Sequence, residues 1–344
     1  MFNLSKTHKD FPLLIAEIGG NHEGNFNYAK KLTRLAINSG AGAVKFQIYT
    51  GDTLVSKLES PQRNIHFKKF ELSNEQHIEL AKMVLDAGRL YSSSVWDVKA
   101  LEWIDPYVSF YKIGSGDLTA YPVLKAIALR NKPIVLSTGL STEDEVVECV
   151  KYLQDLNHIY KKQSHLGVLQ CTSMYPITQN DVHLDVMKKF EEKYSWTSGY
   201  SDHTEGTLAL ETAVAMGAKI LEFHFTDSRE GKSFRDHKVS LTCDEVLGLR
   251  EKIKSIKALQ GQPTKQPLPI EIENGHDLSF RRAVYPSKDI DKGEILDESN
   301  LTVLRPLSGI DARDYEKLIG RRILRDVKKH QKLEWNFIID VEIA

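Results

Sequence analysis

The first 260 residues alternate between short apolar runs and longer amphipathic stretches. Runs of apolar and β-branched residues occur at positions 13–18, 43–48, 90–95, 110–113, 133–137, 166–171, 197–201 and 219–225. Such short runs are typical of strands that are buried on both faces. Between them, stretches such as 27–39, 73–88, 142–154 and 207–216 repeat apolar residues every three or four positions. This spacing predicts amphipathic helices between the strands.

Eight strands separated by helix-forming segments are what a closed parallel barrel requires. The alternative is an open, doubly wound sheet, which usually carries a glycine-rich turn with the pattern G-x-G-x-x-G after its first strand. The first turn here, residues 19–24, reads Gly-Gly-Asn-His-Glu-Gly and does not place its glycines in that pattern. We therefore predict an α/β fold, a (β/α)8 TIM barrel over residues 1–260.

The pattern changes after residue 260. Residues 261–279 contain three of the eleven prolines and little periodicity, so we predict an extended linker there. Residues 280–344 form a compact charged segment with strand-like pieces at 282–285, 294–296 and 301–304 and a single predicted helix at 311–318. A segment of this size can hold a modest core of its own. We expect a small second domain.

Composition excludes several classes of protein. The 46 Lys and Arg residues balance 47 Asp and Glu residues, so no overall positive field favours nucleic acid or an acidic membrane. No apolar run approaches the ~20 residues of a membrane span, and residues 1–11 lack the pattern of a signal peptide. Three widely spaced cysteines argue against a disulfide framework or a structural zinc site. We expect a soluble, cytoplasmic protein.

Polar residues follow nearly every predicted strand, and in a barrel these strand ends form the active-site face. They are Glu17, Lys45, Gln47, Ser94, Lys112, Ser115, Asp117, Ser137, Thr138, the segment 172–175, the segment 201–203 and His224. Lys45 and Lys112 lie within otherwise apolar strands, where an ammonium is costly unless an anion meets it. The set predicts a pocket for a small molecule that carries phosphate and carboxylate groups.

Two histidines and one cysteine at these strand ends are candidates for metal binding and for nucleophilic catalysis. His203 and His224 end adjacent predicted strands, so their imidazoles can share one divalent cation. An open, oxygen-rich site favours Mn²⁺, with Mg²⁺ or Co²⁺ as alternatives, over structural zinc. Cys171 could serve as a nucleophile, but it lies within a buried strand with no neighbouring base in the sequence, and we expect it to be structural.

Ordered motifs along the barrel resemble those of the sialic acid synthase family. They are residues 16–24 (AEIGGNHEG), 43–47 (AVKFQ), 112–117 (KIGSGD), 136–139 (LSTG), 170–176 (QCTSMYP), 200–204 (YSDHT), 221–226 (LEFHFT) and 236–241 (DHKVSL). Residues 281–284 (RRAV), 291–294 (DKGE) and 304–310 (LRPLSGI) are similar to the antifreeze-like (SAF) module of that family. The resemblance covers nearly the whole chain.

The resemblance implies an activity. The family condenses phosphoenolpyruvate with an N-acylated hexosamine, giving a nine-carbon 2-keto sugar acid and phosphate. It implies further that Arg305 of the small domain enters the barrel of a partner subunit in a domain-swapped homodimer.

It also implies a role for each site residue. His203 and His224 resemble the family's Mn²⁺ ligands, and Glu17, Asp117 and Lys45 resemble its catalytic groups. The phosphoenolpyruvate contacts would be Lys45, Ser94, Lys112, Ser115, Ser137, Ser173 and Ser201, and the sugar contacts would be Gln47, Tyr175, Asp236 and Arg305.

Two departures from the family pattern lie near the expected sugar pocket. Asp117 and Ser173 replace the Glu and Asn of many bacterial members, although animal-type members share them. Residues 229–235 lack the usual Gly-Pro or Gly-Ser step before Asp236. The acceptor sugar and its phosphorylation state are therefore left open. The alternatives are another phosphoenolpyruvate-condensing synthase of 3-deoxy sugar acids and a catalytically silent glycan-binding protein.

Overall fold

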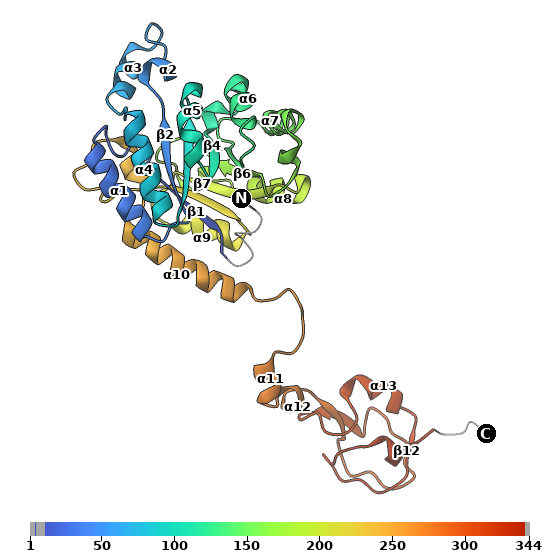
Figure 1. Ribbon diagram of the computed structural model, residues 1–344. Coiled ribbons are helices and arrows are strands. Elements are labelled where there is room, and N and C mark those ends of the chain that lie inside the picture. Colours follow the sequence, from blue (N-terminus) through green and yellow to red (C-terminus); the bar gives the residue numbers. More distant parts are fainter. Residues whose placement is uncertain (1–3, 5–10, 341–344) are drawn as a thin grey trace. The chain divides into compact units, whose positions relative to one another are not determined.

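The computed structural model describes residue 4 and residues 11–340, so most of the amino-terminal segment that lacks a signal-peptide pattern lies outside the described residues. The chain divides into two compact units, Met1–Gly261 and Gln262–Ala344, which are considered separately here (Figure 1). Within the described ranges, no helix has the length and apolar content needed to cross a lipid bilayer.

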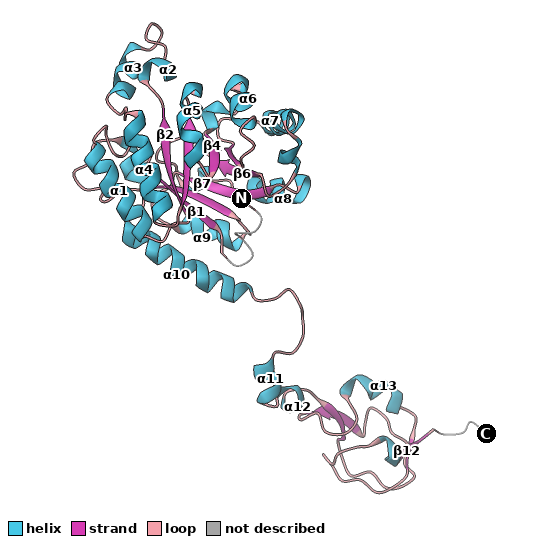
Figure 2. Ribbon diagram, viewed as in Figure 1, coloured by secondary structure: helices cyan, strands magenta, loops and turns pink. Residues whose placement is uncertain are grey.

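The first unit is a closed barrel of eight parallel strands, which confirms the predicted fold (Figure 2). The strands are β1 (Leu13–Glu17), β2 (Ala43–Ile48), β3 (Leu90–Val95), β4 (Phe110–Ile113), β5 (Ile134–Ser137), β6 (Leu166–Cys171), β7 (Thr197–Asp202) and β8 (Ile220–His224). Each strand pairs with its neighbours in sequence, and β1 closes the barrel by pairing with β8. Every predicted apolar run forms one strand, with ends that differ by at most one residue.

Helices surround the barrel on its outside, except for the two short ones of the segment 51–68, which lie beyond the end of β2 (Figure 1). They are α1 (Phe26–Asn38), α2 (Gly51–Leu54), α3 (Pro61–Lys68), α4 (Asn74–Asp86), α5 (Leu101–Ile104), α6 (Tyr121–Ala128), α7 (Glu143–Leu156), α8 (Asp185–Tyr194), α9 (Leu208–Ala215) and α10 (Cys243–Gln260). Several begin at a capping box. In α7, for example, Thr142 Oγ1 accepts from the Glu145 amide, and the Glu145 carboxylate accepts from the Thr142 amide.

The barrel interior is built in two layers. The lower layer is an apolar plug of Leu13, Ile15, Ala43, Phe110, Val135, Leu169 and Ile220, together with Leu4. Because side chains alternate along a strand, the residue two positions further on points to the same face. Ile15 is followed by Glu17, Phe110 by Lys112 and Ile220 by Glu222. The alternation therefore places a polar layer directly above the plug, at the carboxyl ends of the strands.

The second unit has its own small core, centred on Val284, Leu296, Leu318 and Ile323. Its elements are α11 (Pro269–Glu273), α12 (His276–Ser279), β9 (Ala283–Pro286), β10 (Leu301–Leu304), α13 (Tyr315–Leu318), β11 (Arg322–Ile323) and β12 (Ile338–Ile339). Strands β9 and β10 pair antiparallel, as do β11 and β12.

Three expectations for this region differ from the structure. Residues 294–296 form no strand, and only an isolated bridge joins Ile295 to Arg322. The helix predicted at 311–318 is a 3-10 turn, Ala312–Asp314, followed by the single turn of α13. The predicted extended linker contains α11 and α12, so that only residues 261–268 lie between helices. Such a segment spans at most about 26 Å when extended, less than half of what a linker over 261–279 would reach.

Candidate active site at the carboxyl ends of the strands

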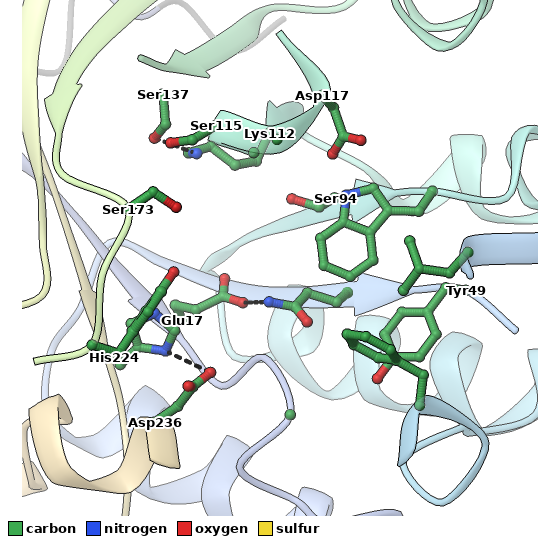
Figure 3. Close-up of a pocket in the computed structure, with 18 of the residues that line it drawn as sticks. Glu17, Tyr49, Ser94, Lys112, Ser115, Asp117, Ser137, Ser173, His224 and Asp236 are labelled. Carbon is green, nitrogen blue, oxygen red and sulfur yellow. Dashed lines mark hydrogen bonds and ion pairs between the residues drawn. The ribbon is translucent and has the colours of Figure 1, made fainter. Parts of the chain in front are cut away.

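A cavity of about 690 Å³ opens at the carboxyl ends of the barrel strands (Figure 3). Fourteen of the residues singled out from the sequence line it: Glu17, Lys45, Gln47, Ser94, Lys112, Ser115, Asp117, Ser137, Ser173, Tyr175, Ser201, His203, His224 and Asp236. Arg305 belongs to the second unit and is not part of this lining. Strand ends that are far apart in the sequence therefore meet around one space.

The floor of the cavity holds a buried network of four charges. Lys45 forms ion pairs with Glu17 and, at 3.0 Å, with Glu222. Lys112 Nζ lies 3.3 Å from Glu222 Oε2, which also accepts a 2.8 Å hydrogen bond from Ser201 Oγ. Two ammonium groups thus face two carboxylates, and the floor is neutral.

These ion pairs and the burial of the groups shift the pKa values of Glu222 and of both lysines. Burial alone would raise the pKa of Glu222, but Lys112 and Lys45 hold it below its ordinary value. Burial alone would likewise lower the pKa of Lys45, but Glu17 and Glu222 outweigh it and raise that pKa. The pKa of Lys112 is lowered, chiefly by burial. Lys112 is therefore the less firmly charged of the two lysines.

Glu222 is the main residue that the sequence analysis missed. We expected Lys45 and Lys112 to meet an anion of the substrate, whereas the protein itself supplies the carboxylates of Glu17 and Glu222. The sequence does contain a signal for Glu222 as a cavity residue. It lies two positions before His224 and therefore points to the same face of the strand. A carboxylate at that position is the natural partner for two buried lysines.

Glu222→Ala should lower the free energy of unfolding by about 3–5 kcal/mol, because it leaves two ammonium groups buried without their shared carboxylate. Urea unfolding measures this change. Glu251→Ala, which removes only an exposed pair with Lys254, serves as the control and should change stability by less than about 0.5 kcal/mol. A Glu222→Ala protein that unfolds at the same urea concentration as the control would contradict the buried network.

Hydroxyl groups gather beside this network. Lys112 Nζ donates to Ser137 Oγ at 2.6 Å, and Ser115 Oγ accepts from the Gly139 amide at 3.0 Å. A Cβ at Gly139 would lie 2.8 Å from Ser115 Oγ and 3.0 Å from Ser173 Cβ, so only glycine lets these segments approach. The result is a pocket of neutral donors next to a lysine, a chemistry that suits phosphate or carboxylate oxygens.

Two carboxylates of the lining, Glu17 and Asp117, differ in their surroundings. Gln47 Nε2 donates to Glu17 Oε1 at 2.9 Å, which orients that carboxylate across the cavity (Figure 3). Asp117 lies near the strand that ends at Ile113, and burial raises its pKa. A carboxylate with a raised pKa is a stronger base than an exposed one, which suits the activation of water.

The two histidines share one wall of the cavity with Tyr175. Their ring centroids are 5.4 Å apart, and the Tyr175 ring lies 3.9 Å from His203. His203 Nδ1 lies 2.7 Å from the carbonyl oxygen of Thr172, which leaves Nε2 available. Burial and the neighbouring His224 lower the pKa of His203 to about 3, so the imidazole is neutral and can donate a lone pair.

This donor set fits a divalent ion that takes few ligands from the protein. His224 Nδ1 is buried without a hydrogen bond. Across residues 11–340, no group of three or more His, Cys, Asp or Glu side chains is arranged to hold a metal. An ion on the two imidazoles would therefore complete its coordination with water or substrate oxygens, as an open catalytic site requires.

Cys171 also lines the cavity, with its sulfur 3.9 Å from His203 Nδ1. Burial raises the pKa of this thiol above its ordinary value. The thiolate form that a nucleophile requires is therefore disfavoured.

The outer part of the cavity is aromatic, which the sequence analysis did not foresee. Phe70 packs against Phe234 with ring centroids 4.7 Å apart, and Tyr49 packs against Trp96 at 5.3 Å. Phe67, His66, Arg63 and Arg235 also line this part. Helix α3 supplies three of these residues from within the segment that follows β2. Helical periodicity alone does not show that a helix lies at the mouth of a barrel.

The segment that carries Asp236 is anchored at its start. Tyr28 OH donates to Asp227 Oδ1 at 2.5 Å, and Lys232 Nζ donates to Tyr28 OH at 2.6 Å. Arg229 forms a two-pronged ion pair with Glu245 at the beginning of α10. Residues 234–236 lie beyond these contacts, at the mouth of the cavity.

Comparisons with known proteins place the whole chain among sugar-acid synthases by sequence similarity. The sequence model of the NeuB family matches residues 32–265, and the model of the SAF domain matches residues 281–339. An N,N'-diacetyllegionaminic acid synthase of Campylobacter jejuni is 34% identical over 93% of this chain and 98% of its own length. The human N-acetylneuraminate-9-phosphate synthase is 32% identical over 92% of this chain and 89% of its own. The crystal structure of the N-acetylneuraminic acid synthetase of Leptospira borgpetersenii superposes with a TM-score of 0.71, at 27% identity over 78% of this chain and 91% of that one.

Proposed function

Because this chain belongs to the NeuB family, we propose that it condenses phosphoenolpyruvate with an N-acylated hexosamine, giving a nine-carbon 2-keto sugar acid and inorganic phosphate. The observation that carries the proposal is one cavity in which three groups adjoin: a floor of paired lysines and carboxylates, a cluster of serine hydroxyls and a pair of imidazoles. Each group suits one part of this reaction.

The donor would bind over the floor. Lys112 and the hydroxyls of Ser115, Ser137 and Ser173 offer donors for the phosphate and carboxylate oxygens of phosphoenolpyruvate. Lys45, Ser94 and Ser201 complete this set. Ser94 Oγ is buried without a hydrogen-bond partner, as expected for a hydroxyl that donates to a bound ligand. Holding the donor in this way would contribute much of the rate gain through positioning.

The acceptor would bind on the side of Gln47, Tyr175 and Asp236. We propose Mn²⁺ as the ion held by His203 and His224; when bound, it would polarise the aldehyde oxygen of the acceptor. The methylene carbon of phosphoenolpyruvate then forms a bond to the aldehyde carbon, and positive charge develops on the neighbouring carbon. The carboxylate of Glu17 favours that charge.

Water completes the reaction. The oxygen of a water molecule adds to the positively charged carbon, and the carboxylate of Asp117 accepts the proton that this water loses. The bond from that carbon to its bridging oxygen then breaks, and the oxygen leaves with phosphate. The hydroxyl left on that carbon becomes the keto oxygen as its proton passes to the departing phosphate. The proton accepted by Asp117 balances the one that the aldehyde oxygen gains when it becomes a hydroxyl.

Phosphate release tests the proposed function. Purified protein with MnCl₂, phosphoenolpyruvate and a panel of N-acylated hexosamines should release one phosphate for each molecule of sugar acid, identified by mass spectrometry. Phosphorylated aldoses without an acyl group serve as the comparison, since they are acceptors for related synthases of 3-deoxy sugar acids. Phosphate release with those aldoses and not with any hexosamine would contradict the proposal.

We also propose that the enzyme acts as a domain-swapped homodimer in the cytoplasm. An arginine at position 305, in the second unit, would supply fixed donors for the N-acyl carbonyl of the acceptor bound to the partner chain. Three unpaired cysteines suit a reducing compartment.

A further inference from the structure

Two arginines lie at the outer end of the cavity, and neither was assigned a role above. Arg63 comes from helix α3, and Arg235 comes from the segment between β8 and α10; both line the same cavity. Their supporting residues are in contact, because Phe70, next to α3, packs against Phe234 at 4.7 Å. The two cationic side chains therefore belong to one aromatic rim.

Most N–H donors of these two guanidinium groups have no hydrogen-bond partner among the described residues. Arg235 Nε lies 3.1 Å from Asp236 Oδ1, but its two terminal nitrogens form no hydrogen bond with any residue that the structure describes. Arg63 has no carboxylate partner within the described part of the chain and rests against the ring of Phe67. Both lysines of the floor are paired with carboxylates, as is Arg235 with Asp236. Among the described residues that line the outer part of the cavity, Arg63 thus keeps its charge without a carboxylate partner, and Arg235 keeps two terminal nitrogens without a hydrogen bond.

The position of Arg235 relative to the histidines is fixed by Tyr175. The centroid of the Tyr175 ring lies 3.9 Å from that of the His203 ring and 4.3 Å from the guanidinium carbon of Arg235. An open-chain hexose extends about 6 Å from its aldehyde carbon to its sixth carbon, since each C–C bond is about 1.5 Å long. An acceptor with its aldehyde at the histidines can therefore bring its far end to the guanidinium.

From these contacts we propose that the acceptor carries a phosphate at the end remote from its aldehyde, and that Arg235, supported by Arg63, binds this phosphate. The proposal rests on the proposed function and specifies its substrate class. A guanidinium offers several N–H donors in a planar fork, which matches the geometry of phosphate oxygens. Arg235 keeps its Nε on Asp236 and leaves its outer nitrogens free for such a contact.

A neutral acceptor fits these residues less well. An acceptor that ends in a methyl group, such as a 6-deoxy sugar with a second acetamido group, would pack against the aromatic rings. It would also remove water from two guanidinium groups without offering them an acceptor, which costs free energy. The aromatic rim suits the carbon chain of a sugar. The arginines suit an anionic group at the end of that sugar remote from its aldehyde.

Steady-state kinetics with paired acceptors tests the proposal. With N-acetylmannosamine 6-phosphate, kcat/KM of the wild-type enzyme should exceed that with N-acetylmannosamine by at least about 10-fold. Arg235→Gln should lower this ratio by about 10- to 100-fold, the effect expected when a charge-assisted hydrogen-bond pair is lost, and Arg63→Gln should lower it by a smaller factor. Arg34→Gln, an exposed arginine on α1, is the matched control and should keep the wild-type ratio.

The outcomes separate the hypotheses. A wild-type enzyme that prefers N-acetylmannosamine, or its 2,4-diacetamido-2,4,6-trideoxy analogue, would overturn the phosphate site and leave the proposed function intact. A rise in KM for phosphoenolpyruvate in Arg235→Gln, with the acceptor ratio unchanged, would mean that the arginine binds the donor, which also overturns the proposal. No phosphate release with any hexosamine would overturn the proposed function itself.

Discussion

His203→Ala should lower kcat by about a thousand-fold or more while the protein stays folded. The imidazole contributes one of only two protein nitrogens to the proposed ion, and an ion that polarises a carbonyl supplies several kcal/mol of transition-state stabilisation. Its Nδ1 is held at the Thr172 carbonyl, so alanine removes the ligand but no buried charge. Activity and Mn²⁺ binding, the latter followed by electron paramagnetic resonance, should fall together.

Removal of the metal should have the same effect as removal of its ligand. Treatment with EDTA followed by dialysis should abolish phosphate release, and addition of MnCl₂ should restore it in the wild type but not in His203→Ala. His158→Ala, an exposed histidine beyond α7, is the control and should keep full activity. Full activity in metal-stripped protein would refute the role of both histidines.

Arg305→Ala should be nearly inactive, and a mixture with His203→Ala should regain activity. In the proposed homodimer, each barrel receives Arg305 from its partner, so a mixed dimer contains one complete site. Random reassociation makes half of the dimers mixed, so the co-refolded mixture should reach about a quarter of wild-type activity. Each variant refolded alone is the control.

The connection between the units allows such an exchange but limits it. Residues 261–268 reach at most about 26 Å. Within the second unit, α12 is already tied to the small domain, because Leu307 N donates to Leu278 O at 2.9 Å. In the proposed dimer, the two barrels would therefore lie close together. If mixing restores no activity although mixed dimers form, as shown by mass spectrometry of the native complex, Arg305 acts within its own chain or has no role in catalysis.

The sequence predicted the barrel well because its signals are local. A strand buried on both faces shows as a short apolar run, and the polar residue that follows the apolar plug, such as Lys112 after Phe110, marks the carboxyl end. These patterns depend only on residues close together in the chain. They therefore predict which side chains face the cavity.

Partnerships across the barrel could not be predicted in the same way. Glu222 meets Lys45 because β8 and β2 flank β1 on opposite sides, an arrangement that exists only in the closed barrel. The aromatic rim likewise depends on α3 and Phe234, which are brought together from positions far apart in the chain. The helices α11 and α12 were missed because they are short and because the prolines at 263, 267 and 269 give the segment a composition that favours an irregular linker.

The anchored segment between β8 and α10 has a consequence for how such enzymes diversify. The contacts of Tyr28 with Asp227 and of Arg229 with Glu245 hold the beginning of this segment through residues that take no part in the reaction. Phe234 and Arg235 take no part in these two contacts, and their side chains line the cavity. Mutations at these two positions can therefore change which sugar is accepted without disturbing the buried floor. A lineage could acquire a new acceptor through single substitutions while it keeps its chemistry.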